Sequence, residues 1–295
     1  MAMSKIFSRL FIFIPISFIF FACTTLSFDR ATDENITYNE NEYIPEKFDW
    51  EKSNDFIDYF IFENKNIPVR YVMTRINLAS EQIKLCYYPE VYETENLYYN
   101  DISVKNFSKK NDCAIAINAT QFSYKNLIKN KVKLEGIYSI DGTIFSKAIP
   151  RYSAIKLSRQ EKGYKGEILV HQDNIAEEGS FIIGGFFTIL KDGELFDSTG
   201  KNFSYTSHDS RTAVAFSKDG SILYILVVEG EKKNRSKGLS YPECAKLFKA
   251  VGGYSAIEFD GGSSSAIFLQ NKNILTYTTL RNTGCCIGFC DIKNL

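Results

Sequence analysis

The chain has 295 residues, and its 35 Lys and Arg residues balance its 35 Asp and Glu residues, so the formal net charge is zero. This balance provides no overall positive field, and we expect no nucleic acid among the partners. Hydrophobic residues make up 44% of the chain, which is sufficient for the core of one large domain or two small ones.

The first 23 residues have the pattern of a targeting segment. Lys5 and Arg9 precede an apolar run at residues 10–22 that is short for a membrane span, and Cys23 follows. This arrangement resembles a bacterial lipoprotein signal, in which the chain is cleaved before the cysteine and lipid is attached to the thiol. We therefore expect a signal peptide at 1–23, a lipid on Cys23 and a location at the outer membrane, its periplasmic face or the cell surface. Secretion without lipid is the alternative.

The remaining chain divides into a polar segment and one long folded domain. Residues 24–47 are polar and acidic without periodicity, which predicts a tether, and a single domain is expected at 48–295. Helices are predicted at 53–62 and 104–110. A third helix begins at Ser240, which forms a capping box with Glu243, and ends at the pair Gly252 and Gly253.

Three Asp-Gly pairs predict β-hairpins. They occupy positions 141–142, 192–193 and 219–220, and each lies between two apolar runs. Asp-Gly favours the positive backbone angles of tight hairpin turns, which connect antiparallel strands. The predicted fold class is therefore α+β, with mainly antiparallel or mixed sheet, several hairpins and a few flanking helices.

Six cysteines remain when Cys23 is set aside. An even number in an exported chain is compatible with disulfides, but six cysteines allow 15 pairings and the sequence does not choose among them. We expect at least one disulfide that involves the C-terminal cluster, with buried free thiols as the alternative for the others. The six are Cys86, Cys113, Cys244, Cys285, Cys286 and Cys290.

Several familiar catalytic motifs are missing from the sequence. Only two histidines exist, His171 and His208, and no His-Glu-x-x-His motif or zinc-ligand spacing is present. The sequence also lacks the Gly-x-Ser-x-Gly nucleophile elbow, the Walker loop and the dinucleotide-binding glycine motif. No cofactor is required by these patterns. A divalent cation is compatible with converging carboxylates, but no ligand spacing calls for one.

The segment 254–265 carries the most informative chemistry. Glu258 and Asp260 are two residues apart at the end of a predicted strand, so both side chains are expected on one side of the sheet. Gly261 and Gly262 allow a sharp turn and a close approach of the backbone to a ligand. Three serines follow at 263–265 and add hydroxyl groups. This combination suits a sugar, a phosphate or the bond that joins them.

Six short segments resemble, in order, the motifs of the phosphodiester glycosidase family. They are Asn-Ala-Thr-Gln-Phe at 118–122, Gly-Gly-Phe at 184–186, Arg-Thr-Ala-Val at 211–214, Leu-Val-Val-Glu-Gly at 226–230, Leu-Ser-Tyr-Pro-Glu-Cys-Ala at 239–245 and Asp-Gly-Gly-Ser-Ser at 260–264. The resemblance covers about residues 110–290. The chain departs from the family pattern at Gln121, Phe186, Glu258 and Ser263.

The resemblance implies a hydrolase that cleaves the bond between an anomeric carbon and a phosphate oxygen, as in a GlcNAc-1-phosphodiester of envelope or host glycans. Asp260 would act at the sugar, with Glu229 as its partner, and Arg211 would hold the phosphate. A structural ion pair is the alternative for Arg211, and a solvated acid at a strand end is the alternative for Glu229. Further substrate contacts are expected from Asn118, Thr212, Gly261, Gly262, Ser264, Glu258 and His208.

A second function remains open on the sequence alone. The departures from the family motifs are also compatible with an inactive surface lipoprotein that binds glycans or a protein partner through the same groove. The substrate sugar, retention or inversion at the anomeric carbon, and the oligomeric state are not indicated by the sequence.

Overall fold

The structure is a computed structural model, and it describes residues 38–90, 98–125, 130–199, 205–230, 232, 234–278 and 280–294. The described residues belong to one compact unit. The predicted signal peptide and Cys23 lie outside the described residues. In the described part of the chain, no helix is both long and apolar enough to cross a membrane.

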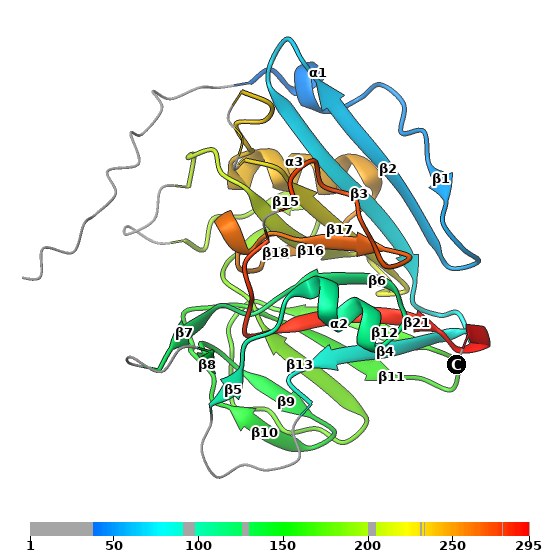
Figure 1. Ribbon diagram of the computed structural model, residues 1–295, viewed down its shortest axis with the longest axis vertical. Helices are drawn as coiled ribbons and strands as arrows, with labels where there is room; N and C mark the ends of the chain where they lie inside the picture. The colour runs from blue at the N-terminus through cyan, green and yellow to red at the C-terminus, as the bar shows by residue number, and fades with distance from the viewer. Residues whose placement is uncertain are drawn as a thin grey trace, which may run out of the picture. The chain divides into compact units, whose positions relative to one another are not determined.

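Four antiparallel sheets dominate the fold (Figure 1). The largest has eight strands in the order β1 (Glu51–Lys52), β2 (Ile57–Asn64), β3 (Val69–Asn77), β17 (Ile222–Val228), β16 (Arg211–Phe216), β18 (Ser255–Glu258), β14 (Thr188–Lys191) and β15 (Glu194–Leu195). We call it the main sheet.

Three smaller sheets complete the β-structure. The inner sheet has the order β20 (Lys272–Asn273), β19 (Ile267–Leu269), β6 (Cys113–Asn118), β21 (Cys286–Asp291) and β4 (Ile83–Tyr88). A second five-stranded sheet has the order β10 (Thr143–Ser146), β9 (Tyr138–Ile140), β13 (Ser180–Gly184), β11 (Ala154–Arg159) and β12 (Tyr164–Leu169). The smallest has β5 (Tyr99–Asn100), β8 (Lys131–Leu134) and β7 (Phe122–Tyr124).

Three α-helices are present among the described residues: α1 (Glu40–Tyr43), α2 (Val104–Lys110) and α3 (Tyr241–Val251), with short 3₁₀ turns at Gly262–Ser264 and Ile292–Asn294. The fold class is therefore mainly β, and the predicted α+β class is corrected. The antiparallel hairpins themselves are confirmed. Asp141 and Asp192 have positive φ, as tight Asp-Gly turns require, and each is followed by a glycine with positive φ.

Two of the three predicted helices are confirmed, and one is wrong. Helix α2 covers 104–110, and α3 starts after Ser240 and ends at Gly252, whose φ is 98°. The predicted helix at 53–62 is instead a turn followed by β2. The Asn54 side chain accepts hydrogen bonds from the N–H groups of Phe56 and Ile57, which fixes the turn. The aromatic and β-branched residues that follow favour a pleated strand.

The predicted tether at 24–47 ends earlier than expected. Helix α1 lies within it, and Tyr43 is fully buried in a core cluster with Tyr71. The Tyr71 hydroxyl donates to the Tyr43 carbonyl at 2.8 Å. The folded body thus begins no later than Tyr38.

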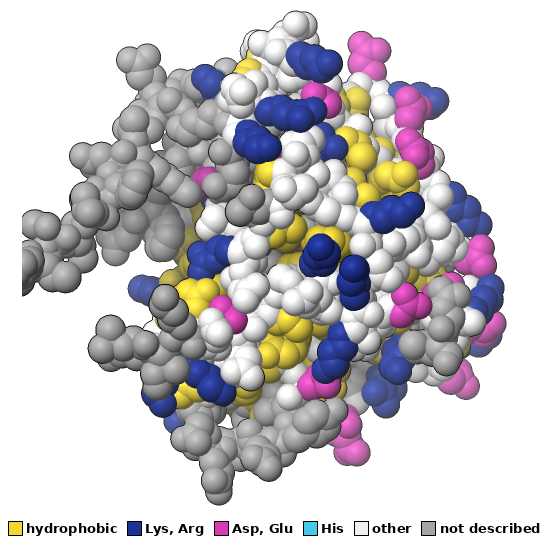
Figure 2. All heavy atoms as spheres, viewed as in Figure 1, with side chains coloured by type: hydrophobic (Ala, Val, Ile, Leu, Met, Phe, Trp, Pro, Cys, Tyr) yellow, Lys and Arg dark blue, Asp and Glu magenta, His cyan; other side chains and the backbone are white. Residues whose placement is uncertain are grey.

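The two faces of the main sheet have separate cores. On one face, α3 packs Cys244, Leu247 and Phe248 against alternate residues of β16 and β17. On the other face, Val214 and Ile225 contact the inner sheet. Helix α2 covers the far side of the inner sheet (Figure 1). On the face of the molecule shown in Figure 2, basic and acidic side chains are interspersed.

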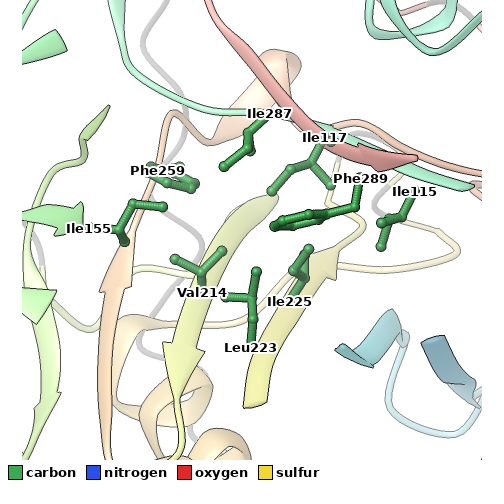
Figure 3. A pocket seen from close by; sticks show the side chains of 10 residues that line it. Ile115, Ile117, Ile155, Val214, Leu223, Ile225, Phe259, Ile287 and Phe289 are labelled. Atoms are coloured by element: carbon green, nitrogen blue, oxygen red, sulfur yellow. The ribbon is translucent and has the colours of Figure 1, made fainter. Parts of the chain in front are cut away.

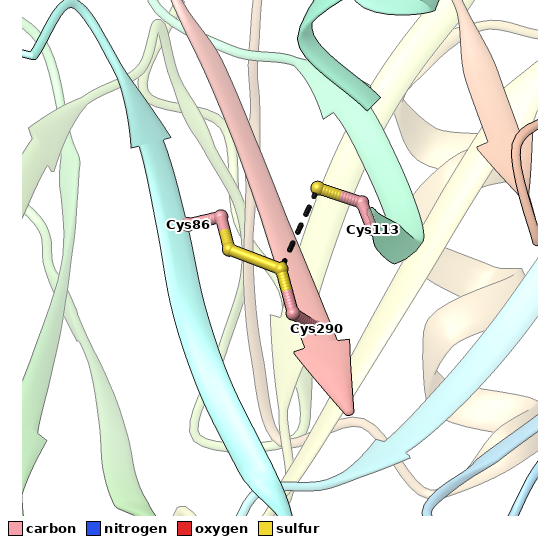
Figure 4. Close-up of side chains that lie close together, drawn as sticks. All are labelled: Cys86, Cys113 and Cys290. Atoms are coloured by element: carbon pink, nitrogen blue, oxygen red, sulfur yellow. Dashed lines mark hydrogen bonds between the residues drawn. A yellow bond between two sulfur atoms is a disulfide. The ribbon is translucent and has the colours of Figure 1, made fainter. Parts of the chain in front are cut away.

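A disulfide joins two strands of the inner sheet. Cys86 on β4 is bonded to Cys290 on β21, and the Cys113 thiol of β6 lies 3.8 Å from the Cys290 sulfur (Figure 4). The expected disulfide from the C-terminal cluster is confirmed. Cys113, Cys244, Cys285 and Cys286 are buried free thiols, so the two alternatives coexist in one chain.

Candidate functional site

The Asp260 loop, residues 260–264, lies where β18, β16 and β6 meet. The N–H of Phe259 donates to the Thr212 carbonyl at 2.8 Å, which continues the pairing of β18 with β16. The N–H of Asp260 then turns to the Ala119 carbonyl beyond the end of β6, at 2.9 Å, and the N–H of Gly262 donates to the Ser210 carbonyl at 2.9 Å. The loop is therefore held by backbone hydrogen bonds to residues at the ends of β16 in the main sheet and β6 in the inner sheet.

The Asn118 side chain stabilises the Asp260 loop through hydrogen bonds. Its side-chain amide donates to the Asp260 carbonyl at 2.6 Å. Its carbonyl oxygen accepts from the Thr212 hydroxyl at 2.9 Å and from the Ala266 N–H at 3.0 Å. Asn118 and Thr212 are both 0% exposed. These two predicted substrate contacts thus lie together, but their polar groups are directed at the protein's own backbone and at each other.

Asp260 presents a carboxylate at the partly buried mouth of the loop. Burial raises the pKa of Asp260 to about 6, although the Ser264 hydroxyl and the nearby Arg281 guanidinium lower it. A carboxyl group with a pKa near 6 is mostly ionised at pH 7 and is more basic than an ordinary aspartate. Such a group is suited to proton transfer or to attack at a sugar.

Glu258 has a different environment from Asp260, contrary to the expectation that both face one side. Strand β18 ends at Glu258 and the chain bends after it, so the two-residue alternation of a strand no longer applies. Glu258 is 1% exposed on the face covered by α3, and neither carboxylate oxygen has a hydrogen-bond partner among the described residues. Burial raises the pKa of Glu258 to about 8, while Arg211 and the Cys244 thiol lower it.

Arg211 lies on the same buried face as Glu258. Its Nε donates to the Leu239 carbonyl at 2.9 Å and its Nη2 donates to the Ser207 carbonyl at 2.6 Å. The guanidinium also lies over the Tyr241 ring, 4.1 Å from the centroid. Backbone carbonyls and an aromatic face hold this arginine, rather than the ion pair that was the alternative to its predicted role as the phosphate anchor.

The partners of Glu229 come from outside the Asp260 loop. Glu229 forms an ion pair with Arg70 of β3 and accepts hydrogen bonds from the N–H and hydroxyl of Thr276. Glu229 is 1% exposed, so it is not the solvated acid that the alternative predicted. Arg70 also donates to the Ile274 carbonyl at 3.2 Å. Together these contacts fix the segment that leads toward Arg281.

His208 supports the start of α3. Its Nε2 lies 2.7 Å from a carboxylate oxygen of Glu243, and its ring stacks on Tyr38 with centroids 4.6 Å apart. The same oxygen of Glu243 accepts from the N–H and hydroxyl of Ser240. Burial would raise the pKa of Glu243, but the hydrogen bonds from His208 and Ser240 lower it below its usual range. This predicted substrate contact is thus part of a helix cap.

Arg281 is a candidate site residue that was not predicted from the sequence. It is exposed, its Nη1 donates to the Ser263 hydroxyl at 3.4 Å, and its guanidinium lies 4.9 Å from the centroid of Phe122. No motif singled it out, because it follows Asp260 by 21 positions in an irregular segment. Arg281 could have been noticed as the one arginine between the glycine-serine loop and the cysteine pair at 285–286.

Gln121, at a departure from the family motif, lies near the same loop. Its amide nitrogen is 3.4 Å from the Gly185 carbonyl, and its carbonyl oxygen is buried without a partner among the described residues. Gly185 itself contacts the end of β18, since a Cβ there would come within 2.7 Å of the Glu258 carbonyl. A buried amide oxygen without a partner is available to a hydroxyl donor.

An apolar cavity lies in the interior between the sheets. The cavity is small and is lined by apolar side chains from β6, β11, β16, β17 and β21, together with Phe259 (Figure 3). It provides no polar group to orient a ligand. Among the described residues, the one cluster with metal-ligand spacing is Cys86, Cys113 and Cys290, of which two are joined in the disulfide. Asp260 does not belong to such a cluster within the part of the chain that the structure describes.

The fold is shared with solved proteins at low sequence identity. The catalytic domain of zebrafish N-acetylglucosamine-1-phosphodiester alpha-N-acetylglucosaminidase, auto-inhibited by its pro-peptide, is 17% identical with a TM-score of 0.58, and the match covers 84% of this chain and 85% of that one. A protein from Burkholderia pseudomallei K96243 that is described as exported is 12% identical with a TM-score of 0.62, covering 75% and 74%.

A hypothetical protein from Synechocystis is 13% identical with a TM-score of 0.56. That match covers 80% of this chain but 62% of the Synechocystis chain, so this chain spans less than two thirds of that relative. No curated protein matches the sequence.

The sequence model of the phosphodiester glycosidase family matches residues 111–289, which is more than half of the chain. The chain belongs to the phosphodiester glycosidase family. Membership indicates a glycosidase-type function, and the matched range includes Asp260 and the other residues predicted to act in catalysis or substrate binding.

Proposed function

We propose that the protein hydrolyses the glycosidic bond of a sugar-1-phosphodiester of the GlcNAc-1-phosphate type, in envelope or host glycans. The observation that supports this most directly is Asp260. Its carboxyl group has a pKa near 6, lies at the mouth of a loop fixed by two sheets, and is close to the exposed Arg281. A basic carboxylate beside a cation matches a substrate with an electrophilic anomeric carbon and a phosphate.

In the proposed reaction, the bond between the anomeric carbon and the phosphate oxygen breaks and water supplies the new hydroxyl. The products are a free sugar and a phosphate monoester. The phosphate leaves with the bonding electrons and needs little help from a general acid. Asp260 would attack the anomeric carbon, activate the water or stabilise the developing positive charge. No cofactor has a role in this scheme.

The other predicted residues would act mainly by holding Asp260. Asn118 and Thr212 fix the loop, and Gly261, Gly262 and Ser264 shape it around the carboxylate. Arg211 and Glu258 would stabilise the buried face of β16 and β18 beside the loop, and Glu229 would fix the segment of Thr276. His208 would act through the cap of α3.

Export with a lipid on Cys23 is part of the proposal. Support comes from the signal-like pattern at 1–23 and from the buried disulfide, because disulfides persist in oxidising compartments. The similar protein from Burkholderia pseudomallei is also described as exported.

Turnover of defined substrates tests the proposal. Purified protein would be incubated with alkyl esters of GlcNAc-1-phosphate and related sugars, and the release of free sugar would be followed by proton NMR, which also reports the anomer formed. Asp260→Asn should lower the rate by about 100-fold or more. Asp192→Asn, at the exposed β14–β15 turn, is the matched control and should retain the wild-type rate.

Folded wild-type protein that binds such esters but releases no sugar from any of them would refute the hydrolase. That result would favour the glycan-binding lipoprotein instead.

A further inference from the structure

The two arginines near the Asp260 loop differ in how free they are to bind a ligand. Arg211 is 7% exposed, and its Nε and Nη2 already donate to backbone carbonyls while Tyr241 covers one face. To grip a phosphate with two parallel hydrogen bonds, a guanidinium must present an unoccupied edge. The remaining N–H groups of Arg211 lie in the interior with the rest of the side chain, so a phosphate would have to lose its hydration to reach them.

Arg281 meets the requirement that Arg211 does not. It is exposed, and within the described part of the chain one of its five N–H donors is engaged, through a long 3.4 Å hydrogen bond to Ser263. That hydroxyl is itself exposed and belongs to the Asp260 loop. A guanidinium and a hydroxyl that already face each other form a site for an anion that both can donate to.

The position of Arg281 is fixed by the residues around it. The guanidinium lies over Phe122, 4.9 Å from the ring centroid, which orients the planar group. Phe122 can approach because position 284 is glycine: a Cβ there would lie 2.8 Å from the Phe122 Cβ. Upstream, Glu229 and Arg70 hold residues 274 and 276. The position of Arg281 is thus fixed both by Phe122 and by the contacts of the residues that precede it in the chain.

We infer that Arg281, together with the Ser263 hydroxyl, forms the anion-binding site that receives the phosphate of the substrate, and that Arg211 does not contact it. This inference rests on the proposed function for the identity of the substrate. The arrangement places a cation on one side of the Asp260 loop and the Asp260 carboxylate in the same loop. A sugar-1-phosphate can therefore bind with its phosphate at Arg281 and its anomeric carbon at Asp260.

Binding measurements with two probes test the inference without requiring turnover. The probes are GlcNAc-1-phosphate and the neutral methyl glycoside of GlcNAc, each titrated by isothermal calorimetry. Arg281→Ala should weaken binding of the phosphate probe by about 10- to 100-fold and leave the methyl glycoside unchanged. Arg281→Lys should fall between the two, because an ammonium keeps the charge but loses the paired donors.

Arg159→Ala is the matched control. Arg159 is an exposed arginine on β11, outside the Asp260 loop, and its replacement should leave both affinities unchanged. Equal phosphate affinity in wild type and Arg281→Ala would overturn the inference, as would a wild-type protein that shows no preference for the phosphate probe.

Asp260→Asn separates this inference from the proposed reaction. The variant should lose sugar release while it keeps the Arg281-dependent affinity for GlcNAc-1-phosphate. If wild-type protein binds the probe through Arg281 but hydrolyses no phosphodiester, the hydrolase fails and the anion site stands. If sugar is released and Arg281→Ala has the wild-type KM, the anion site fails and the hydrolase stands.

Discussion

Replacement of Asn118 by alanine should destabilise the protein strongly, because this one side chain satisfies three groups in the interior. Asn118→Ala would remove the partners of the Asp260 carbonyl, the Thr212 hydroxyl and the Ala266 N–H, which now lie 2.6, 2.9 and 3.0 Å from it. A buried polar group left without a partner costs about 1–3 kcal/mol. Partial relaxation around the space left by the side chain would reduce the sum of these three costs. We therefore expect the free energy of unfolding to fall by about 3–6 kcal/mol.

Urea unfolding followed by circular dichroism measures this loss from the midpoint and slope of the transition. Thr212→Val is the matched control, since it removes one of the three hydrogen bonds and should cost about 1–2 kcal/mol. The double variant should cost less than the sum of the two singles, because Asn118 and Thr212 are partners.

A loss below about 1 kcal/mol for Asn118→Ala would refute this reasoning. If sugar binding then fell while stability held, Asn118 would be a ligand contact, as the sequence had suggested.

Two further predictions concern charge and space around the same loop. Burial raises the pKa of Asp260 to about 6 and that of Glu258 to about 8, so between about pH 4 and pH 8 the folded state binds more protons than the unfolded state at these two groups. Their contribution to the free energy of unfolding is therefore present at low pH and is lost as the pH rises through this window. Glu258→Gln should flatten the decline of Tm with pH above about 6, and an unchanged slope would contradict the assignment. Gly284→Ala would press a methyl group against Phe122, 2.8 Å from its Cβ, and should cost about 1–3 kcal/mol in unfolding free energy and weaken binding of GlcNAc-1-phosphate. A variant with wild-type affinity would indicate that Phe122 does not position Arg281.

The structural features that could be predicted from the sequence are those that depend on residues close together in the chain. The capping box at Ser240 and the glycine at 252 gave both ends of α3, and Asp-Gly pairs gave the hairpins, because each feature needs contacts only between near neighbours. The helix predicted at 53–62 was wrong for the complementary reason. Asn54 can cap a helix or close a turn, and pairing with β3 decides between them.

The chemistry of the site depends on partners that are distant in the sequence. Glu229 finds Arg70 at a separation of 159 residues, and Asn118 finds Asp260 at a separation of 142. The local sequence around an acidic residue at the end of a strand does not indicate whether the carboxylate faces a substrate or a buried arginine. Arg281 was not predicted because its neighbour Phe122, on β7, is distant in the sequence.

The pairing of β3 with β17 along seven residues bears on where this protein can be divided. The family match begins at residue 111, yet β3 and β4 precede it and cover the open sides of β17 and β21. A polypeptide that started at 111 would expose two long strand edges with unpaired backbone groups, and would leave Glu229 and Cys290 without Arg70 and Cys86. Such a fragment would associate with itself through those edges. The smallest unit that folds is therefore longer than the stretch by which the family is recognised.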